Sequence, residues 1–246
     1  MLLVADVHGA HEALARVARS GEPLLVLGDL LDLFDYRTGA GLMVELVGRD
    51  LVLEFLRRRD GDPAAGRAAW RAYEQAHRDE MGARFERLVR EAYARLAEAL
   101  AGAEAYVTYG NTDRPDLLRE CLPPGVCFVD GEVVEIEGLR VGVVGGGSSY
   151  PGRVSEEDLT AKLAGLGEVD ILCTHLAPAV EPLGCDVIAG RSKHSRAVLD
   201  YLLSRRPRRH YFGDVHQPQA LSWRVGETLC RNVGFFRDTG RAVRHG

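Results

Sequence analysis

The sequence predicts an α/β protein built on a mixed sheet, or on two packed sheets, flanked by helices. Short apolar runs alternate with helical patterns along most of the chain. The segment DGEVVEIEGLRVGVVGG (130–146) contains two alternating strands around Glu137 and Gly138, a hairpin signal, so part of the sheet is antiparallel. A chain of 246 residues with 46% hydrophobic and 27% charged residues is long enough to bury a full core.

The elements follow in order from the first residues. Leu2, Leu3 and Val4 form an apolar run too short for a helix, so a strand is expected at 2–5, then a helix at about 10–20 and a strand at 23–27. Further short runs, apolar or alternating, predict strands at 105–109, 126–129, 132–137, 139–144, 171–174, 209–212, 219–225 and 228–232.

Residues 37–104 break this alternation with helix-forming sequence. We expect one helix at about 42–59, a break at DGDPAAG (60–66) and a second helix at about 66–101. An apolar stripe along the second helix is predicted to pack as core, with His77 a packed histidine rather than a ligand; it comprises Trp70, Tyr73, His77, Met81, Phe85, Leu88, Ala92 and Leu96. A straight helix of this length would extend about 50 Å, so the segment must kink, project or pack against another subunit.

Charge and cysteine content restrict the partners and the compartment. A net charge of −5 and a pI near 5.9 argue against a broad basic surface for duplex nucleic acid, and residues 37–104 hold twelve arginines and twelve acidic residues. No apolar run is long enough to span a bilayer, and no secretory leader precedes the first strand. Five cysteines without a C-x-x-C pair favour free thiols, so a cytoplasmic protein without a membrane partner is expected.

Polar side chains that can bind metals follow five of the predicted strands. They are Asp6 and His8, Asp29 and Asp32, Asn111 and Asp113, His175, and finally Asp214 and His216. Strand ends on one edge of an α/β sheet converge on a crevice, so these side chains are expected to meet. Asp, Asn and His without Cys suit Mn²⁺, Fe, Zn²⁺ or Mg²⁺, and clustered carboxylates repel one another without cations. Each motif alone could be a capped turn, but five such endings together predict a metal site.

The ordered motifs D-x-H, G-D-x-x-D, G-N-x-D, T-H and G-x-x-H resemble the calcineurin-like metallophosphoesterase superfamily, in particular its prokaryotic phosphodiesterase-like branch. The resemblance implies one domain over 1–246 with a four-layered α/β/β/α sandwich, interrupted here by the helical insertion at about 37–104. Because this insertion follows Asp32 closely, it is expected to act as a lid or as a dimerisation arm. It also implies two divalent metals, with Mn expected before Fe, Zn or Mg. Asp6, His8 and His216 would hold the first metal, Asp29 would bridge, and Asn111, His175 and Asp214 would hold the second.

Two positions depart from the pattern of the superfamily. Thr112 stands where the superfamily commonly has a histidine that serves as general acid or phosphate contact, and Asp214 stands at the first histidine of G-H-x-H. Without that histidine, diesters or activated esters are favoured over unactivated monoesters. Asp214 would shift the second site from Zn²⁺ toward Mn²⁺ or Mg²⁺.

The residues then support a ranked set of functions. The first is hydrolysis of a small-molecule phosphodiester by a dinuclear site with a bridging hydroxide nucleophile. Asp29, Asn111 and Asp113 are the candidate catalytic residues, with Asp113 orienting Asn111 or a ligand histidine; the candidate substrate contacts are Thr112, Arg114, Arg191 and His194. A metal-binding scaffold without catalysis is the alternative, supported by Thr112 and Asp214. A nuclease is third, because it would need a cationic groove.

Overall fold

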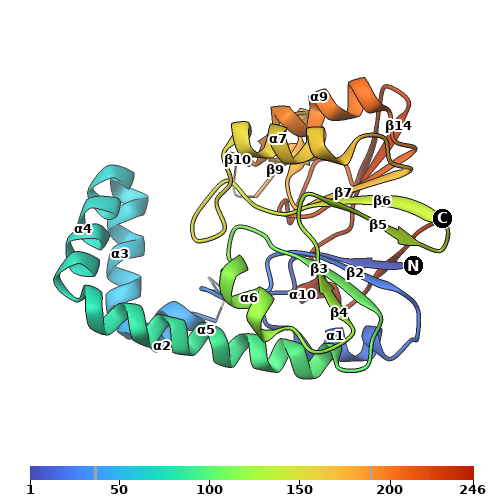
Figure 1. Cartoon of the computed structure of the whole chain (residues 1–246). Helices are drawn as coiled ribbons and strands as arrows, with labels where there is room; N and C mark the ends of the chain where they lie inside the picture. Colours follow the sequence, from blue (N-terminus) through green and yellow to red (C-terminus); the bar gives the residue numbers. More distant parts are fainter. Residues whose placement is uncertain (36–37, 189) are drawn as a thin grey trace.

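The computed structural model describes residues 1–35, 38–188 and 190–246 and contains two large sheets that face each other, with helices on both outer faces (Figure 1). The first sheet has the order β15-β1-β2-β3-β4. Its parallel strands are β1 (Leu2–Val4), β2 (Leu24–Leu27), β3 (Ala105–Thr108) and β4 (Val126–Phe128). The C-terminal strand β15 (Val243–Arg244) joins β1 in antiparallel orientation.

The second sheet has the order β13-β14-β12-β7-β6-β5 and is parallel in its centre. Its strands are β5 (Glu132–Ile136), β6 (Leu139–Val144), β7 (Ile171–Thr174), β12 (Arg209–Phe212), β13 (Ser222–Val225) and β14 (Thr228–Asn232). The predicted hairpin joins β5 to β6 through Glu137 and Gly138, whose φ values of 53° and 76° give the tight turn that matches strand twist. The strand predicted at 219–225 begins at Ser222.

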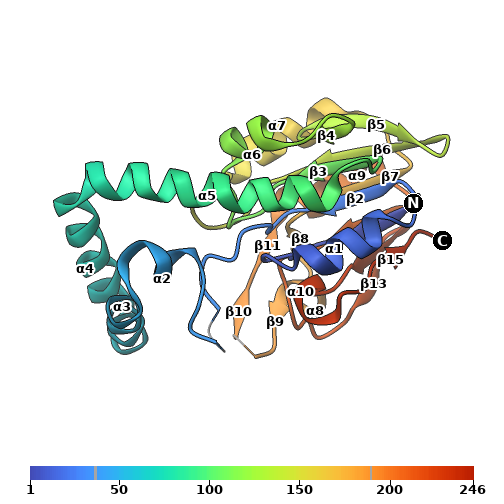
Figure 2. The same ribbon diagram turned by 90° about the horizontal axis from the view of Figure 1, so that it is seen from below.

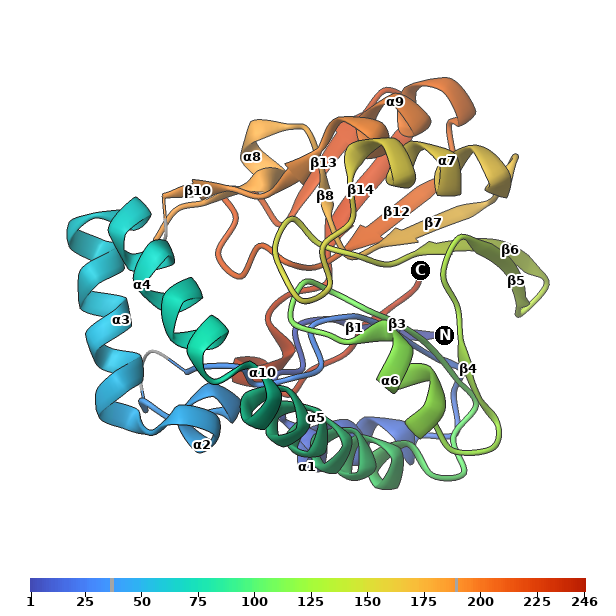
Figure 3. The same cartoon turned by 60° about the vertical axis from the view of Figure 1, so that its left-hand side comes forward.

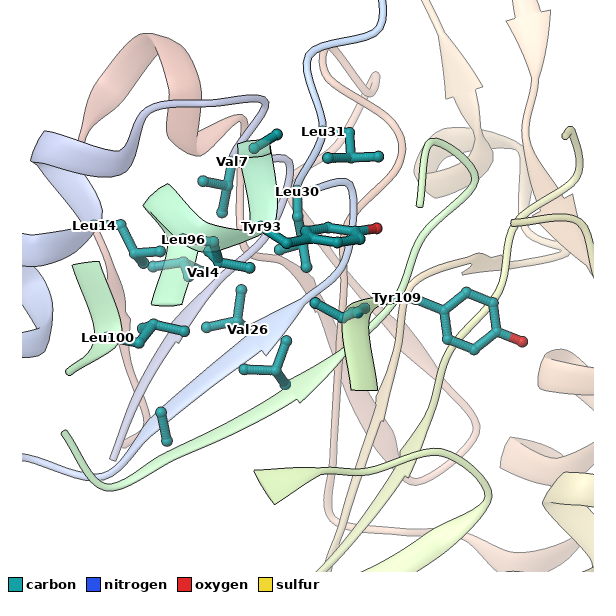
Figure 4. Packing of buried hydrophobic residues seen from close by; sticks show 14 of the residues in the cluster. Val4, Val7, Leu14, Val26, Leu30, Leu31, Tyr93, Leu96, Leu100 and Tyr109 are labelled. Carbon is teal, nitrogen blue, oxygen red and sulfur yellow. The ribbon is translucent and has the colours of Figure 1, made fainter. Parts of the chain in front are cut away.

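Apolar side chains fill three layers: one between the two sheets, and one between each sheet and the helices that cover it. The predicted four-layered α/β/β/α sandwich is confirmed. Leu3 faces the second sheet, while Leu2 and Val4 face the helices, as alternation along a strand buried on both sides requires. Helices α1 (His11–Ala18), α5 (Arg78–Leu100) and α6 (Pro115–Cys121) cover the first sheet. Figure 4 shows Leu14 of α1 and Leu96 and Leu100 of α5 against the strands. Helices α7 (Glu156–Leu166) and α9 (Arg196–Arg205) cover the second sheet.

The insertion forms four helices instead of the two predicted. They are α2 (Leu42–Val47), α3 (Arg49–Gly61), α4 (Pro63–Ala76) and α5. The helix expected at 42–59 breaks at Gly48, whose φ of 87° lies in the left-handed region that favours glycine. The helix expected at 66–101 begins earlier, because the Asp62 side chain accepts from the backbone N–H groups of Ala64 and Ala65 at 2.8 and 3.1 Å.

A second break at His77 separates α4 from α5, so the segment is kinked, which is one of the alternatives expected for a helix of this length. Helices α3 and α4 form a hairpin in which Phe55 and Trp70 meet edge to face with ring centroids 5.0 Å apart. The hairpin of α3 and α4 projects away from the two sheets, while α5 runs back to the first sheet and lies along its outer face (Figures 2 and 3). The prediction that His77 is packed in the core is wrong, because its side chain is exposed at the bend and stacks only on Tyr73.

Short elements complete the chain around the ends of the second sheet. They are β8 (Ala177–Pro178), α8 (Glu181–Gly184), β9 (Cys185–Asp186), β10 (Arg191–Ser192), β11 (His194–Ser195) and α10 (Phe236–Thr239). Within the described ranges, none of the helices combines the length and the apolar character that crossing a membrane requires.

Candidate metal centre

The metal-binding residue types predicted from the motifs lie at the carboxyl ends of parallel strands. Asp6 and His8 follow β1, Asp29 follows β2, and Asn111 follows β3 in the first sheet. His175 follows β7, and Asp214 and His216 follow β12 in the second. The two sets of loops are joined directly, because the Asp214 N–H donates to the Asp6 carboxylate at 3.1 Å and His175 Nδ1 contacts the Leu27 carbonyl at 2.8 Å.

Unusual backbone conformations concentrate at these positions. Among the described residues, six other than glycine have positive φ, and four of these are Asp6 (57°), His8 (40°), Asp29 (53°) and Asp214 (63°). Residues with side chains rarely adopt this region, and such strain clusters at functional sites. The surrounding structure therefore holds the four side chains in orientations that the local sequence alone does not favour.

The glycines before Asp29 and Asn111 allow their loops to touch. A Cβ on Gly28, which has φ +92°, would lie 2.4 Å from the Gly110 backbone nitrogen. A Cβ on Gly110 would lie 2.3 Å from Asp29 Oδ1 and 2.6 Å from His175 Cε1. The small residue in each motif is thus needed for close approach, and Asp29 lies against the Asn111 loop.

The acidic and imidazole side chains form two overlapping groups that share Asp29. The first group contains Asp6, His8, Asp29 and His216, and the second contains Asp29, His175 and Asp214. Within each group, one potential ligand atom per residue lies within 4.8 Å of the others. His8 Nε2 is 3.6 Å from Asp29 Oδ2, His175 Nε2 is 3.3 Å from Asp29 Oδ1, and His216 Nε2 is 3.5 Å from Asp6 Oδ1. The structure shows that these groups are close enough to hold a metal ion.

The imidazoles are oriented as metal ligands would be. His8 Nδ1 lies 3.0 Å from the Leu31 carbonyl, and His175 Nδ1 lies 2.8 Å from that of Leu27. A carbonyl only accepts, so each Nδ1 carries a proton, and each Nε2 faces the carboxylates, where it can bind a metal once it is unprotonated. His216 stacks on Phe235 with ring centroids 3.9 Å apart.

Several polar atoms at the centre have no hydrogen-bond partner among the described residues. These buried atoms are His8 Nε2, His175 Nε2, His216 Nε2 and Asp214 Oδ2. Buried polar atoms are normally paired, and an unpaired set of lone pairs facing one space suits a cation. The donor set, imidazole nitrogen with carboxylate oxygen, therefore fits the divalent metals that the motifs predict.

Burial and mutual charge shift the protonation of the centre. Burial alone would raise the pKa of Asp6, but the contact with His216 and the charges of the three imidazoles lower it to about 2. Burial would lower the pKa of His175, but the carboxylates of Asp29, Asp214 and Asp6 raise it to about 9. In the metal-free protein, His175 is therefore a buried counter-charge to the carboxylates.

The raised pKa of His175 predicts how pH acts on the metal-free protein. A histidine with a raised folded pKa contributes stability that is complete below its ordinary value of 6.5 and is lost as pH rises through about 9. We expect the melting temperature of the EDTA-treated protein to fall between these pH values, and Mn²⁺ affinity to rise roughly tenfold or more over the same window, because metal displaces the proton. The His175→Gln variant should show weaker pH dependence in both. A metal-free melting temperature that rises over this window would contradict the prediction.

Asp113 joins the loops instead of orienting a ligand side chain. Its carboxylate accepts from the backbone N–H groups of Leu30 at 3.0 Å, Leu31 at 3.2 Å and Gly110 at 2.8 Å. The Tyr93 hydroxyl of α5 also donates to it at 3.4 Å. Burial and the nearby Asp29 raise the pKa of Asp113 to about 6, against the opposing effect of the backbone N–H groups. The sequence-based expectation that Asp113 orients Asn111 or a ligand histidine does not match these contacts.

The four residues predicted to contact the substrate lie in different environments. Thr112 lies in the centre, where its N–H and hydroxyl donate to Asp29 Oδ1 at 2.9 and 3.2 Å. The Arg114 guanidinium forms two bonds to Asp116, at 3.0 and 2.6 Å. His194 is exposed on β11. Arg191 lies on β10, but its side chain is outside the described part of the chain.

Two residues at the centre were missed by sequence reasoning. Lys193 Nζ lies 2.8 Å from Asp214 Oδ1, and Phe235 stacks on His216. A signal existed for Lys193, because Lys162 and Lys193 are the two lysines among 31 Lys and Arg residues. No sequence signal marked Phe235, which reaches the centre from the turn before α10.

No protein-family model matches the chain, and no curated protein matches it. Among solved structures, 31 chains match. One crystal structure aligns with a TM-score of 0.59 at 15% identity, covering 96% of this chain and 90% of the other. The protein TT1561 of Thermus thermophilus aligns with a TM-score of 0.53 at 11% identity, covering 98% and 96%. At these identities the likeness shows the fold alone, and it agrees with an α/β sandwich over nearly the whole chain.

Proposed function

We propose that the chain is a metal-dependent phosphoesterase that hydrolyses phosphodiesters of small molecules. The observation that carries the proposal is the set of three buried imidazole Nε2 atoms that face the carboxylates of Asp6, Asp29 and Asp214 and find no hydrogen-bond partner in the described part of the chain. A purely structural cluster would leave these ring nitrogens without hydrogen bonds and the buried carboxylates balanced only in part by protonated imidazole.

The side chains divide between two cations that share Asp29. Asp6, His8 and His216 would hold one, and His175, Asp214 and Asn111 would hold the other. When bound, divalent ions polarise a phosphoryl oxygen and lower the pKa of water enough to supply hydroxide near neutral pH. The harder oxygen donors of Asp214 and Asn111 favour Mn²⁺ for this set, with Fe, Zn²⁺ and Mg²⁺ as alternatives.

Thr112 supports a diester in preference to a monoester. Its hydroxyl is directed at Asp29 Oδ1, 3.2 Å away, so the position where the superfamily places a histidine holds no side chain of suitable pKa to protonate a leaving group. Departure then depends on the acidity of the leaving alcohol. An activated diester tolerates this better than an unactivated monoester does.

A direct assay tests the function. With Mn²⁺ added, we expect the purified protein to hydrolyse bis-p-nitrophenyl phosphate at least about tenfold faster than phenyl phosphate, because a general acid contributes about 10²–10⁴-fold where the leaving group is basic and p-nitrophenolate departs without one. EDTA should remove the activity, and Mn²⁺ should restore it. Absence of turnover on both compounds, with metal bound, would overturn the proposal.

That last outcome would favour a second candidate, a metal-binding scaffold without catalysis. The observation that favours it is the pairing of Asp214 with Lys193, which reduces the negative charge available to a second cation.

The helical insertion at about 37–104 has two predicted roles, and both are still open. The segment before the insertion lies near the centre, because Asp32 pairs at 2.8 Å with Arg237, whose backbone N–H donates to the Asp6 carbonyl at 3.1 Å. A lid over the centre and a dimerisation arm both stay predictions.

A further inference from the structure

Lys193 brings a positive charge into one half of the metal centre. Its Nζ lies 2.8 Å from Asp214 Oδ1 and 2.9 Å from the Asp214 backbone carbonyl. Within the described residues, neither Asp6 nor Asp29 forms an ion pair with a lysine or arginine. The group Asp6, His8, Asp29 and His216 therefore has no ammonium or guanidinium paired with its carboxylates, whereas the group Asp29, His175 and Asp214 has the Lys193 ammonium paired with Asp214.

The position of the ammonium is well defined. The Lys193 backbone N–H donates to the Gly184 carbonyl at 2.7 Å, which fixes the residue between β10 and β11. Asp214 is fully buried, while the Lys193 side chain keeps 26% of its surface exposed, so the amine reaches the carboxylate from the solvent side. The pair is neutral overall, as a histidine ligand at position 214 would be.

Asp214 Oδ1 is also the neighbour of Asn111. The Asn111 amide lies 2.9 Å from this oxygen, and with its nitrogen toward Asp214 it donates there while its oxygen accepts from the Thr112 N–H at 3.2 Å. Turned the other way, two acceptor oxygens would face each other, which requires a cation between them. In the metal-free protein, Lys193 and Asn111 together thus saturate Oδ1 and leave Oδ2 as the free ligand atom of Asp214. To act as the proposed ligand, the Asn111 amide has to turn its oxygen toward the cation.

We propose that Lys193 sets the affinity of the second cation, so that the group Asp6, His8, Asp29 and His216 binds Mn²⁺ at least tenfold more tightly than the group Asp29, His175 and Asp214. A divalent ion in the second group is repelled by the ammonium and has fewer free oxygen atoms to bind. The inference shares with the proposed function the premise that divalent cations occupy the centre, but it is measured without substrate.

Isothermal titration of the EDTA-treated full chain with MnCl₂ tests it. We expect one tight and one weaker Mn²⁺ in the wild type, and at least a tenfold gain in the weaker affinity in Lys193→Met. Lys162→Met is the matched control, because Lys162 also pairs with a carboxylate at 2.8 Å, has the same 26% side-chain exposure and lies outside the centre. Two equally tight ions in the wild type, or a folded Lys193→Met with an unchanged second affinity, would overturn the proposal.

If Lys193→Met does not fold, a second measurement on the wild type tests whether the two cations bind with different affinities. Electron paramagnetic resonance of the wild type with one equivalent of Mn²⁺ should show isolated ions, with exchange coupling only at excess Mn²⁺. A coupled spectrum at one equivalent overturns the proposal. Mn²⁺ binding of the expected kind without diester turnover would overturn the proposed function alone, whereas absence of Mn²⁺ binding would overturn both.

Discussion

Replacing Asp29 with asparagine is expected to lower diester turnover by about 10³-fold or more and to remove most of the stabilisation that Mn²⁺ gives the wild type. Asp29 is the one residue that belongs to both ligand groups, so the substitution removes a negative charge from both at once. Asparagine keeps an oxygen for the Thr112 N–H, which donates to Asp29 Oδ1 at 2.9 Å. The loop is therefore expected to keep its conformation.

The same substitution should not destabilise the metal-free protein. Asp29 faces other buried carboxylates, and its charge is one reason that the pKa of Asp113 is raised to about 6. Removing that charge relieves repulsion with Asp113 but weakens the pairing with protonated His175, so the melting temperature in EDTA is expected to change little. Mn²⁺ at a hundredfold excess over Kd stabilises the wild type by about 2.7 kcal/mol, and this gain should be largely lost in the variant.

Asp130→Asn provides the control for this experiment. Asp130 accepts from Lys162 at 2.8 Å and from the Gly145 N–H at 3.0 Å, outside both ligand groups. The control should lose some stability but keep both the Mn²⁺ effect and the turnover. Thermal unfolding with and without Mn²⁺ measures the first, and bis-p-nitrophenyl phosphate measures the second. An Asp29→Asn protein that Mn²⁺ still stabilises as fully as the wild type would argue against Asp29 as the shared ligand.

The sheets could be predicted from sequence because their strands are short apolar runs. Leu24, Leu25 and Val26 are all fully buried, since β2 has helices on one face and the second sheet on the other. The order of the strands could not be predicted, because strands far apart in the sequence pair with each other. The clearest case is β15, which pairs with β1 and so joins the two ends of the chain. The helix breaks at Gly48 and His77 were missed, because the periodicity of apolar residues continues across both.

The centre was predicted as far as its motifs coincide with strand ends. Asp6 and Asp29 converge because parallel strands of the first sheet end on one edge, and the facing second sheet brings His175, after β7, to the same place. Lys193 and Phe235 come from segments with no strand-end pattern, and only the tertiary packing places them there. Arg114 was a weak candidate for a substrate contact, because its guanidinium already pairs with Asp116, two residues away in the sequence.

Replacing Asp113 with alanine is expected to lower the free energy of unfolding by about 3–5 kcal/mol. The carboxylate is fully buried and accepts from three backbone N–H groups, those of Leu30, Leu31 and Gly110. Leu30 and Leu31 follow Asp29 directly, and Gly110 precedes Asn111, so one side chain joins two of the ligand loops. Alanine would leave these donors buried without an acceptor, which is the expensive case for a hydrogen bond.

The loss should extend to metal binding, because the loops that carry Asp29 and Asn111 are then joined only by the bonds from Thr112 to Asp29 and by their packing. We expect Mn²⁺ affinity to fall about 10–100-fold, the range seen when outer partners of metal ligands are removed. Urea unfolding and Mn²⁺ titration measure the two effects. Asp113→Asn should also be destabilised although it has the same shape, because both carboxylate oxygens accept from N–H groups and an amide nitrogen cannot.

Asp116→Asn separates this role from a general effect of losing an aspartate near the centre. Asp116 pairs with Arg114 but is 56% exposed, and exposed ion pairs contribute about 1 kcal/mol or less. Tyr93→Phe tests the link to the insertion, since the Tyr93 hydroxyl donates to Asp113 and accepts from the Arg114 N–H at 2.8 Å. If Asp113→Ala cost no more than Asp116→Asn, the loops would have to be held by their packing and the cations alone, and Asp113 would not be the residue that positions them.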